Sequence, residues 1–169
     1  TEGTGGRSWP LADGNMGMVF AGNITPAGVG EWTDGELLQA ITSGVHKDGH
    51  ALFPIMPYDT YGTMTESDAK AIVSYIRTLA PKESPVYPRR LSVLMAKKAS
   101  SSVAPPDWGV PPGLNDILAK GKYLSDMAGC ARCHTPEQDN ELNQERLFSG
   151  GVEFKMAMGT AVSANITPA

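Results

Sequence analysis

Residues 130–134 read Cys-Ala-Arg-Cys-His, and this run constrains the chain more than any other part of its sequence. At the spacing C-x-x-C-H, two thiols add to the vinyl groups of a heme and the following histidine ligates its iron. The chain has 2 cysteines, both in this run, so no disulfide framework organises the fold. The motif predicts one covalent attachment site for heme c, with Cys130 and Cys133 as the thiols and His134 as the proximal ligand.

Two other uses of paired cysteines fit the sequence less well. A thioredoxin-like C-x-x-C follows a strand of a βαβ unit and needs no histidine, and nothing near residue 130 reads as a strand. A structural zinc site usually has four cysteine or histidine ligands, and outside the motif the chain offers only His46 and His50. A zinc or thiol redox module is therefore the less favoured alternative, and a covalently bound heme would exclude it.

Composition and charge narrow the class of protein. The 169 residues carry a formal net charge of -4 and no long basic run, which argues against nucleic acid as a partner. The 19 glycines and 13 prolines indicate many turns and loops, which a heme protein tolerates because the macrocycle supplies much of its apolar core. We expect neither a signal peptide nor a membrane-spanning helix, because no apolar stretch is long enough to cross a bilayer.

Capping residues and apolar spacing predict three helices. The first follows Thr33, which caps it while Glu36 reaches back, and it ends at Gly44. The second follows Thr65, and the third spans residues 114–128 and leads into the cysteine motif. Their apolar faces are built, in this order, from Leu37, Leu38 and Ile41; from Ile72, Tyr75, Ile76 and Leu79; and from Ile117, Gly121, Leu124 and Met127.

Residues 81–113 differ in composition from the segments on either side. They hold seven of the 13 prolines, with the basic residues Arg89, Arg90, Lys97 and Lys98 among them. We expect a linker, at least in part, with these cations on a solvated surface. The apolar run at residues 91–95 is long enough for a short packed helix within it.

One short motif occurs twice in the chain. Asn-Ile-Thr-Pro-Ala at residues 23–27 returns at residues 165–169, and Gly5-Gly6 before the first copy has a counterpart in Gly150-Gly151 before the second. Such self-similarity indicates tandem related units. We therefore expect the chain to begin partway through one unit and to stop partway through the next.

The two halves of the chain resemble two different parts of one protein family. Residues 28–34 and 48–58, with the helix after Thr65, resemble the second half of a bacterial cytochrome c domain. Residues 121–136 and 148–151, with the final Asn-Ile-Thr-Pro, resemble the first half of another. The similarity is to the multiheme cytochrome c subunits of membrane-bound alcohol and gluconate dehydrogenases.

The resemblance implies a fold and a domain organisation. The fold is all-α and cytochrome c-like, with short helices and long loops around heme c. Residues 1–80 are the C-terminal half of one domain, on the side of the distal methionine, and residues 81–113 are a proline-rich linker. Residues 114–169 are the N-terminal half of a second domain, on the side of the C-x-x-C-H motif.

The resemblance also implies ligands for the iron. Met56 corresponds to a distal ligand and His134 to a proximal one, and a thioether opposite an imidazole raises the potential of a cytochrome c. Prolines on both sides of Met56 restrict its loop. Trp32, Tyr58 and Tyr61 are expected to pack against a macrocycle or its propionates, unless they are simply core aromatics.

Two arrangements of these ligands follow from the repeat. In one, Met56 serves a heme whose C-x-x-C-H lies before residue 1, and the distal methionine for the heme at His134 lies after residue 169; Met156 and Met158 are weaker candidates. In the other, the two halves dock, within a chain or by swapping between chains, so that Met56 and His134 share one iron. The second arrangement amounts to a circularly permuted cytochrome c domain.

Function follows from the ligation. A His/Met heme has no open position for a substrate, so the expected role is one-electron transfer from a dehydrogenase donor toward a respiratory acceptor, without enzymatic activity of its own. The alternative is a heme enzyme or small-ligand sensor with an open distal iron site. Bacterial heme c is attached outside the cytoplasmic membrane, so the family implies a periplasmic or membrane-associated location.

Overall fold

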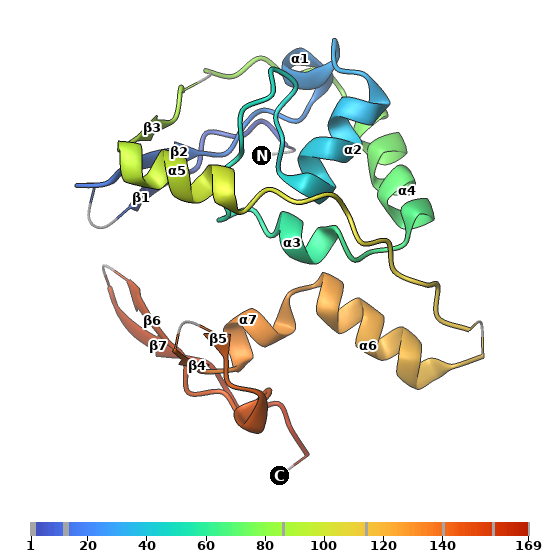
Figure 1. Cartoon of the computed structure of the whole chain (residues 1–169), viewed down its shortest axis with the longest axis vertical. Helices are drawn as coiled ribbons and strands as arrows, with labels where there is room; N and C mark the ends of the chain where they lie inside the picture. The colour runs from blue at the N-terminus through green and yellow to red at the C-terminus, as the bar shows by residue number, and fades with distance from the viewer. Residues whose placement is uncertain are drawn as a thin grey trace. The chain divides into compact units, whose positions relative to one another are not determined.

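The computed structural model describes residues 3–11, 14–85, 87–113, 115–139, 141–156 and 158–168 (Figure 1). The chain divides into two compact units, unit 1 over Thr1–Val110 and unit 2 over Pro111–Ala169. The boundary falls close to the end of the predicted linker. Residues 81–110 are thus grouped with unit 1, and the division into two half-domains stays a prediction.

Unit 1 combines short helices with one small sheet, in which β2 pairs antiparallel with both β1 and β3. The sheet places Trp9 opposite Val19 and Gly17 opposite Leu91. The elements in chain order are β1 (Ser8–Leu11), β2 (Gly17–Phe20), α1 (Pro26–Val29), α2 (Asp34–Ser43), α3 (Tyr58–Tyr61), α4 (Glu66–Arg77), β3 (Arg90–Leu91) and α5 (Val93–Ser101).

The described residues of unit 2 form two α-helices, one 3-10 helix and two hairpins. The hairpins are β4 with β5 and β6 with β7, both antiparallel. The elements in chain order are α6 (Ile117–Met127), α7 (Cys130–His134), β4 (Glu137–Gln138), β5 (Glu141–Leu142), the 3-10 helix η1 (Gln144–Arg146), β6 (Glu153–Met156) and β7 (Gly159–Val162). In the described part of the chain, no helix is long and apolar enough to cross a membrane.

The purely all-α prediction is not confirmed. Helices carry most of the regular structure, but the described residues also form three small antiparallel sheets. Between β1 and β2 the turn uses Gly14 at a φ of 88°, and β2 begins with Gly17 at a φ of 124°. Glycine adopts such values without a steric penalty, so segments that read as glycine-rich loops close into hairpins instead.

Helix α2 begins and ends as the sequence predicts. Thr33 Oγ1 accepts from the Glu36 N–H at 3.2 Å, and Glu36 Oε2 accepts from the Thr33 N–H at 2.7 Å. This second bond lowers the pKa of Glu36. Gly44 ends the helix in the left-handed conformation, with a φ of 70°. The reciprocal capping satisfies the backbone N–H groups of Thr33 and Glu36 at once.

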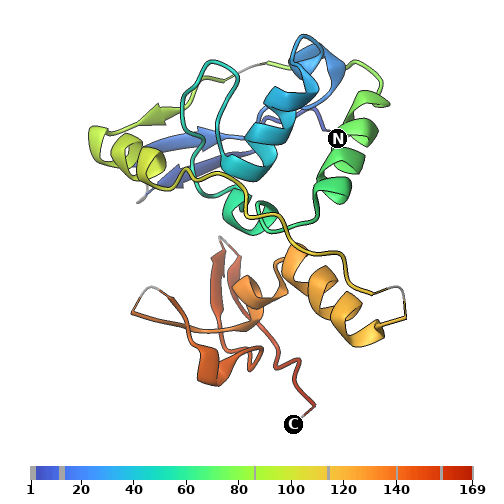
Figure 2. The same ribbon diagram turned by 45° about the vertical axis from the view of Figure 1, so that its right-hand side comes forward.

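Helix α4 confirms the predicted cap but turns a different face to the core. Thr65 Oγ1 accepts from the Asp68 N–H at 3.1 Å. The buried residues are Ala69, Val73 and Ile76, spaced i, i+4 and i+7. Of the predicted face, Ile76 is buried, whereas Ile72 is 39% exposed and Tyr75 is 67% exposed. Helix α4 lies beside α2 (Figure 2), and Val73 and Ile76 pack in one cluster with Leu37 of α2, so this contact determines which face of α4 is buried.

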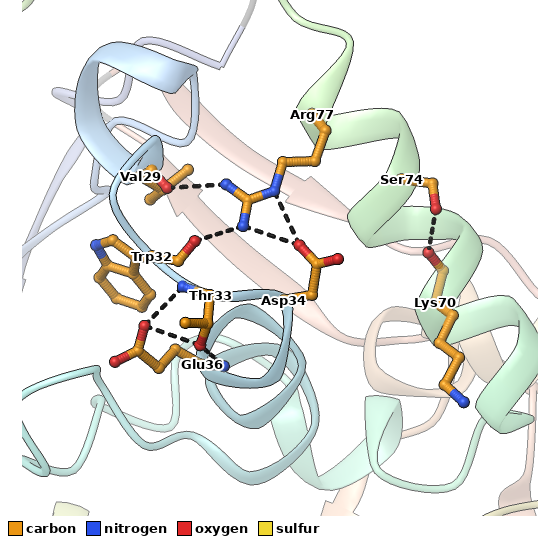
Figure 3. A network of polar contacts seen from close by, with 8 residues as sticks. All are labelled: Val29, Trp32, Thr33, Asp34, Glu36, Lys70, Ser74 and Arg77. Atoms are coloured by element: carbon orange, nitrogen blue, oxygen red, sulfur yellow. Dashed lines mark hydrogen bonds and ion pairs between the residues drawn. The ribbon is translucent and has the colours of Figure 1, made fainter.

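Arg77 ties the end of α4 to the start of α2 (Figure 3). Its Nε and Nη2 donate to Asp34 Oδ1 at 3.0 and 2.9 Å, and its Nη1 donates to the Val29 carbonyl at 3.2 Å. Nη2 also donates to the Trp32 carbonyl. A buried hydrophobic cluster joins these helices. It consists of Val29, Leu37, Val73 and Ile76, with Trp32, Leu38 and Ile41 packed against it.

Within the predicted linker, the apolar run at 91–95 is partly helical. Helix α5 begins behind Ser92, whose Oγ accepts from the Met95 N–H at 3.3 Å. Ala99 of this helix is buried. The segment thus belongs to unit 1, with proline-containing irregular stretches both before β3 and after α5.

Helix α6 is shorter than predicted and leaves its apolar face uncovered within unit 2. It begins after Asp116, whose Oδ1 accepts from the Ala119 N–H at 2.9 Å. The predicted start, Leu114, lies outside the described residues. Ile117 and Leu124 are exposed, and a side chain added at Gly121 would meet no other described atom within 4 Å.

The two copies of the repeated motif have the same local structure. Asn23 Oδ1 accepts from the N–H and the hydroxyl of Thr25 at 2.9 and 2.8 Å, and Asn165 Oδ1 accepts from those of Thr167 at 2.8 and 2.7 Å. An antiparallel hairpin precedes each copy, β1–β2 in unit 1 and β6–β7 in unit 2. Three backbone hydrogen bonds of unit 1 have a counterpart in unit 2. The Gly6 N–H donates to the Ala21 carbonyl, as the Gly151 N–H does to that of Ser163. The Ala21 N–H donates to the Arg7 carbonyl as the Ser163 N–H does to that of Val152, and the Ile24 N–H donates to the Gly3 carbonyl as the Ile166 N–H does to that of Phe148.

Candidate heme-attachment site

The C-x-x-C-H motif forms the helical turn α7. Gly129 precedes it in the left-handed conformation, with a φ of 69°, which separates α7 from the end of α6. Cys130 is half-buried and Cys133 is exposed, and both are free thiols. Because residues three apart lie on the same side of a helix, both thiols can be reached from one side, as addition to one macrocycle requires.

The hydrogen bond of His134 defines which ring nitrogen is available to a metal. His134 Nδ1 lies 2.8 Å from the Ala164 carbonyl oxygen. A carbonyl only accepts, so Nδ1 carries the hydrogen and Nε2 of the neutral ring carries the lone pair. Metal-bound histidines are oriented by such a bond from the second nitrogen. His134 is therefore held in the tautomer that ligates iron through Nε2.

Backbone contacts around His134 hold this hydrogen bond in place. The His134 carbonyl accepts from the Gly150 N–H at 2.7 Å, and the buried Thr135 hydroxyl accepts from the Phe148 N–H at 3.0 Å. A side chain at Gly150 would lie 2.5 Å from the Ala164 oxygen. Only glycine allows the two segments to approach so closely, and this approach brings the Ala164 carbonyl to the histidine.

The residues present in unit 2 fit a heme c. Two free thiols at the attachment spacing precede an imidazole whose Nε2 is unprotonated in the neutral ring. The exposed apolar side chains of α6, among them Leu118 at 87%, offer surface that a macrocycle would cover. Ala164 and Thr135 were missed by sequence reasoning; the Gly150-Gly151 pair beside the repeated motif was the one signal that pointed to them.

Met56 lies in unit 1, in the tight turn before α3. Its N–H donates to the Phe53 carbonyl at 3.3 Å, and its carbonyl accepts from the Tyr58 N–H at 2.8 Å. The side chain is half-buried. Met56 and His134 thus belong to different units, and its role as a ligand stays a prediction. In unit 2, Met158 is fully exposed and Met156 pairs with Gly159 in the β6–β7 hairpin.

The predicted aromatic residues lie in different surroundings. Trp32 is half-buried, and its ring meets that of His46 edge-on, with centroids 4.6 Å apart and an interplanar angle of 82°. Tyr58 is 2% exposed and packs against Gly44, and this burial raises the pKa of its hydroxyl. Tyr58 is therefore buried in unit 1, while Tyr61 is half-buried at the end of α3, and contact of either residue with a macrocycle stays a prediction.

No protein-family model matches the chain, but curated proteins do. It is 29% identical over 170 residues to the fructose dehydrogenase cytochrome subunit of Gluconobacter japonicus, which covers 91% of the chain and 33% of the relative. It is 32% identical over 151 residues to the cytochrome c subunit of the quinone alcohol dehydrogenase of Gluconacetobacter polyoxogenes, covering 82% of the chain and 32% of that relative.

A third relative is the gluconate 2-dehydrogenase cytochrome c subunit of Pantoea cypripedii. The chain is 34% identical to it over 134 residues, which covers 72% of the chain and 30% of the relative. The chain therefore spans about a third of the length of these curated relatives.

Proposed function

We propose that this chain, which is homologous to cytochrome c subunits of bacterial dehydrogenases and so cytochrome c-like in fold, transfers single electrons through a covalently bound heme c. The observation that carries the proposal is the C-x-x-C-H turn whose histidine is oriented by the Ala164 carbonyl. When bound, the heme supplies the one-electron iron couple. The names of the relatives favour an electron-carrying subunit over a heme enzyme or sensor.

The residues of unit 2 have separate roles in this proposal. The sulfur atoms of Cys130 and Cys133 would form the thioethers that hold the macrocycle, and His134 would ligate the iron through Nε2. The exposed apolar side chains of α6, among them Ile117 and Leu118, would offer apolar surface to the macrocycle and keep water from it.

We propose tandem cytochrome c domains in a multiheme protein. The recurring hydrogen bonds support this, because unit 1 carries the same hairpin and Asx turn as unit 2. Ala164, which precedes the second Asn-Ile-Thr-Pro, corresponds to Gly22, which precedes the first. In unit 1 the Gly22 carbonyl is therefore the proposed counterpart of the Ala164 carbonyl, as the acceptor for a proximal histidine.

This correspondence favours separate irons for Met56 and His134. The Nδ1 of His134 already donates to Ala164 within unit 2, so it has no hydrogen left for the Gly22 carbonyl of unit 1. Met56 then serves the heme of unit 1. In the alternative, docked or swapped halves share one iron. His134 then keeps the bond from Nδ1 to the Ala164 carbonyl, and its Nε2 and the Met56 sulfur ligate the same iron.

We also propose the donor, the acceptor and the location. The relatives are named for dehydrogenases of fructose, alcohol and gluconate, so a dehydrogenase of a hydroxyl-bearing substrate is the proposed donor. A respiratory carrier is the acceptor. Because heme c is attached outside the cytoplasmic membrane, the location is periplasmic or membrane-associated.

The attachment and the redox role are tested together on the chain matured with heme. Intact mass measurement is expected to show one covalent heme, lost in the double variant Cys130→Ala, Cys133→Ala. A potentiometric titration is expected to follow a one-electron curve, with about 59 mV per tenfold change in ratio. Bound zinc without covalent heme would contradict the proposal.

A second experiment assigns Met56. A thioether-to-iron absorption band is recorded for the heme-loaded chain and for Met56→Ala, with Met158→Ala as the control for a fully exposed methionine. Separate irons predict that Met56→Ala leaves the spectrum of the heme at His134 unchanged. Loss of the band in Met56→Ala alone would instead establish the shared iron.

A further inference from the structure

A second group of metal-ligating side chains lies in unit 1, in the loop over residues 45–51. The ends of this loop are joined by an antiparallel bridge between Val45 and Ala51. The His46 N–H donates to the His50 carbonyl at 2.9 Å, and the Gly49 N–H donates to the His46 carbonyl at 2.8 Å. Gly49 allows the turn with a φ of 87°. The loop is thus closed by its own backbone.

The closed loop brings two imidazoles and one carboxylate together. The His46 and His50 rings are stacked, with centroids 4.3 Å apart and an interplanar angle of 15°. Asp48 Oδ1 lies 3.0 Å from His46 Nδ1 and also contacts His50 Nδ1. It accepts from the His50 N–H at 3.1 Å as well. One ligand atom from each of the three side chains lies within 4.8 Å of the other two.

This donor set suits a divalent cation of the zinc class. Two imidazole nitrogens and a carboxylate oxygen are ligands that Zn²⁺ accepts, at about 2.0–2.2 Å. Tetrahedral ligands at that range lie about 3.3 Å from one another, so small side-chain rotations bring the three atoms into place. Each neutral ring can move its hydrogen to Nε2, which frees Nδ1 for the metal.

The surroundings hold the loop but leave it accessible. Trp32 packs edge-on against His46 and limits the rotation of that ring. All three ligand side chains are partly exposed to solvent, so a cation can enter and keep water as a fourth ligand. Lys47 lies within the loop, and Arg89 donates to the Ala51 carbonyl. These two cations weaken the attraction for a metal, so the site is one of moderate affinity.

We propose that His46, Asp48 and His50 bind one divalent transition-metal cation, with Zn²⁺ as the probe and water completing the coordination. The site shares no residue with the C-x-x-C-H motif. It therefore goes beyond electron transfer by heme c, and its success or failure is separate from that proposal.

Calorimetry with Zn²⁺ on the full chain tests the site. Cys130 and Cys133 are alkylated first, so that their thiolates do not compete for the metal. We expect one Zn²⁺ per chain, and an affinity at least about tenfold lower in His50→Ala and in Asp48→Asn, because loss of a ligand costs at least as much as loss of its supporting partners. The matched control is Asp107→Asn, which removes an exposed carboxylate elsewhere in unit 1 and should leave the affinity unchanged.

Imidazole resonances of the unaltered chain give an independent reading that does not depend on how the variants fold. Zn²⁺ is expected to shift the signals of His46 and His50 and to leave those of His134 in place. The proposal is overturned by an absence of binding below millimolar Zn²⁺, by equal affinity in His50→Ala, or by shifts confined to His134.

Discussion

Unit 1 and unit 2 differ in where their apolar side chains lie. In unit 1, α1, α2 and α4 contribute Val29, Leu37 and Val73 to one buried cluster. In unit 2, none of the described residues of α6 and α7 is buried. The polar contacts of the two units also differ. In unit 1 the Arg77 side chain joins α4 to the start of α2, whereas in unit 2 backbone hydrogen bonds around His134 hold α7.

The two units therefore obtain their stability from different sources. Unit 1 has a protein core of its own. Covering a large aliphatic side chain gains about 1.5–3 kcal/mol, and unit 2 leaves Ile117 and Leu118 of α6 without that gain. We infer that a heme and its covering residues supply the core that unit 2 lacks.

The largest expected effect concerns the glycine pair of unit 2. In Gly150→Ala the new carbon would lie 2.5 Å from the Ala164 oxygen, whereas in Gly151→Ala it would meet only Arg146 Nη2, at 3.9 Å. Both positions have a positive φ. We expect Gly150→Ala to destabilise unit 2 by about 3 kcal/mol or more and Gly151→Ala by about 1 kcal/mol. Hydrogen exchange of the α7 amides measures both.

The glycine pair of unit 1 provides the matching comparison. Gly5→Ala would place a carbon 2.5 Å from the Ala21 oxygen, while Gly6→Ala meets nothing described within 4 Å. If the hairpins are equivalent, Gly5→Ala costs more than Gly6→Ala, by the same ranking as in unit 2. Equal costs at Gly5 and Gly6 would break the equivalence of the two hairpins.

A core substitution in unit 1 should outweigh a similar change in α6. Val73 is 3% exposed, and Val73→Ala is expected to cost about 2 kcal/mol through lost burial and a cavity. Leu118→Ala should cost less than about 0.5 kcal/mol in the heme-free chain. Urea unfolding is followed by tryptophan fluorescence for unit 1, because all 3 tryptophans lie there, and by hydrogen exchange for α6. A large cost at Leu118 would show that α6 is packed without heme.

The clasp at Arg77 is expected to have a smaller effect. Arg77→Met removes donors to two backbone carbonyls and to Asp34, and should lower the stability of unit 1 by about 1–2 kcal/mol. Lys70→Met, which removes an exposed ion pair with Glu66 on the same helix, should cost about 0.3 kcal/mol. Similar costs for the two variants would mean that the clasp is no stronger than a surface pair.

The smallest expected effect is the pH dependence at Glu36. The Thr33 N–H holds its pKa below the ordinary 4.5, so the unfolded chain binds this proton more readily. The stabilisation is present above about pH 5 and is lost as the pH falls through the lowered pKa. In urea unfolding, Glu36→Gln should reduce the loss of unit 1 stability as the pH falls below about 5. Glu31→Gln, outside the capping box, should leave that pH dependence unchanged.

Local rules predicted part of this fold. The caps at Thr33 and Thr65 and the end of α2 at Gly44 depend on residues within five positions of one another, so the local sequence specifies them. The buried face of α4 depends on which side meets α2, and sequence spacing does not supply that contact. The short strand β3 pairs with β2 across a long stretch of chain, which local patterning does not encode.

The candidate site shows the same limit. The two thiols and the imidazole follow from five consecutive residues. The Ala164 carbonyl that orients His134 is 30 residues away in sequence, and a backbone atom has no residue type by which to recognise it. The burial of Tyr58 could not be read from its residue type, because Gly44, against which it packs, is distant in the sequence.

The acceptor of the His134 hydrogen bond has one more consequence. A carboxylate in that place would gain a proton in acid, and reduction of the iron would then be accompanied by proton uptake. A backbone carbonyl has no proton to exchange. Electron transfer through a heme ligated by His134 would therefore be uncoupled from proton exchange at this hydrogen bond, and its driving force there would not change with pH.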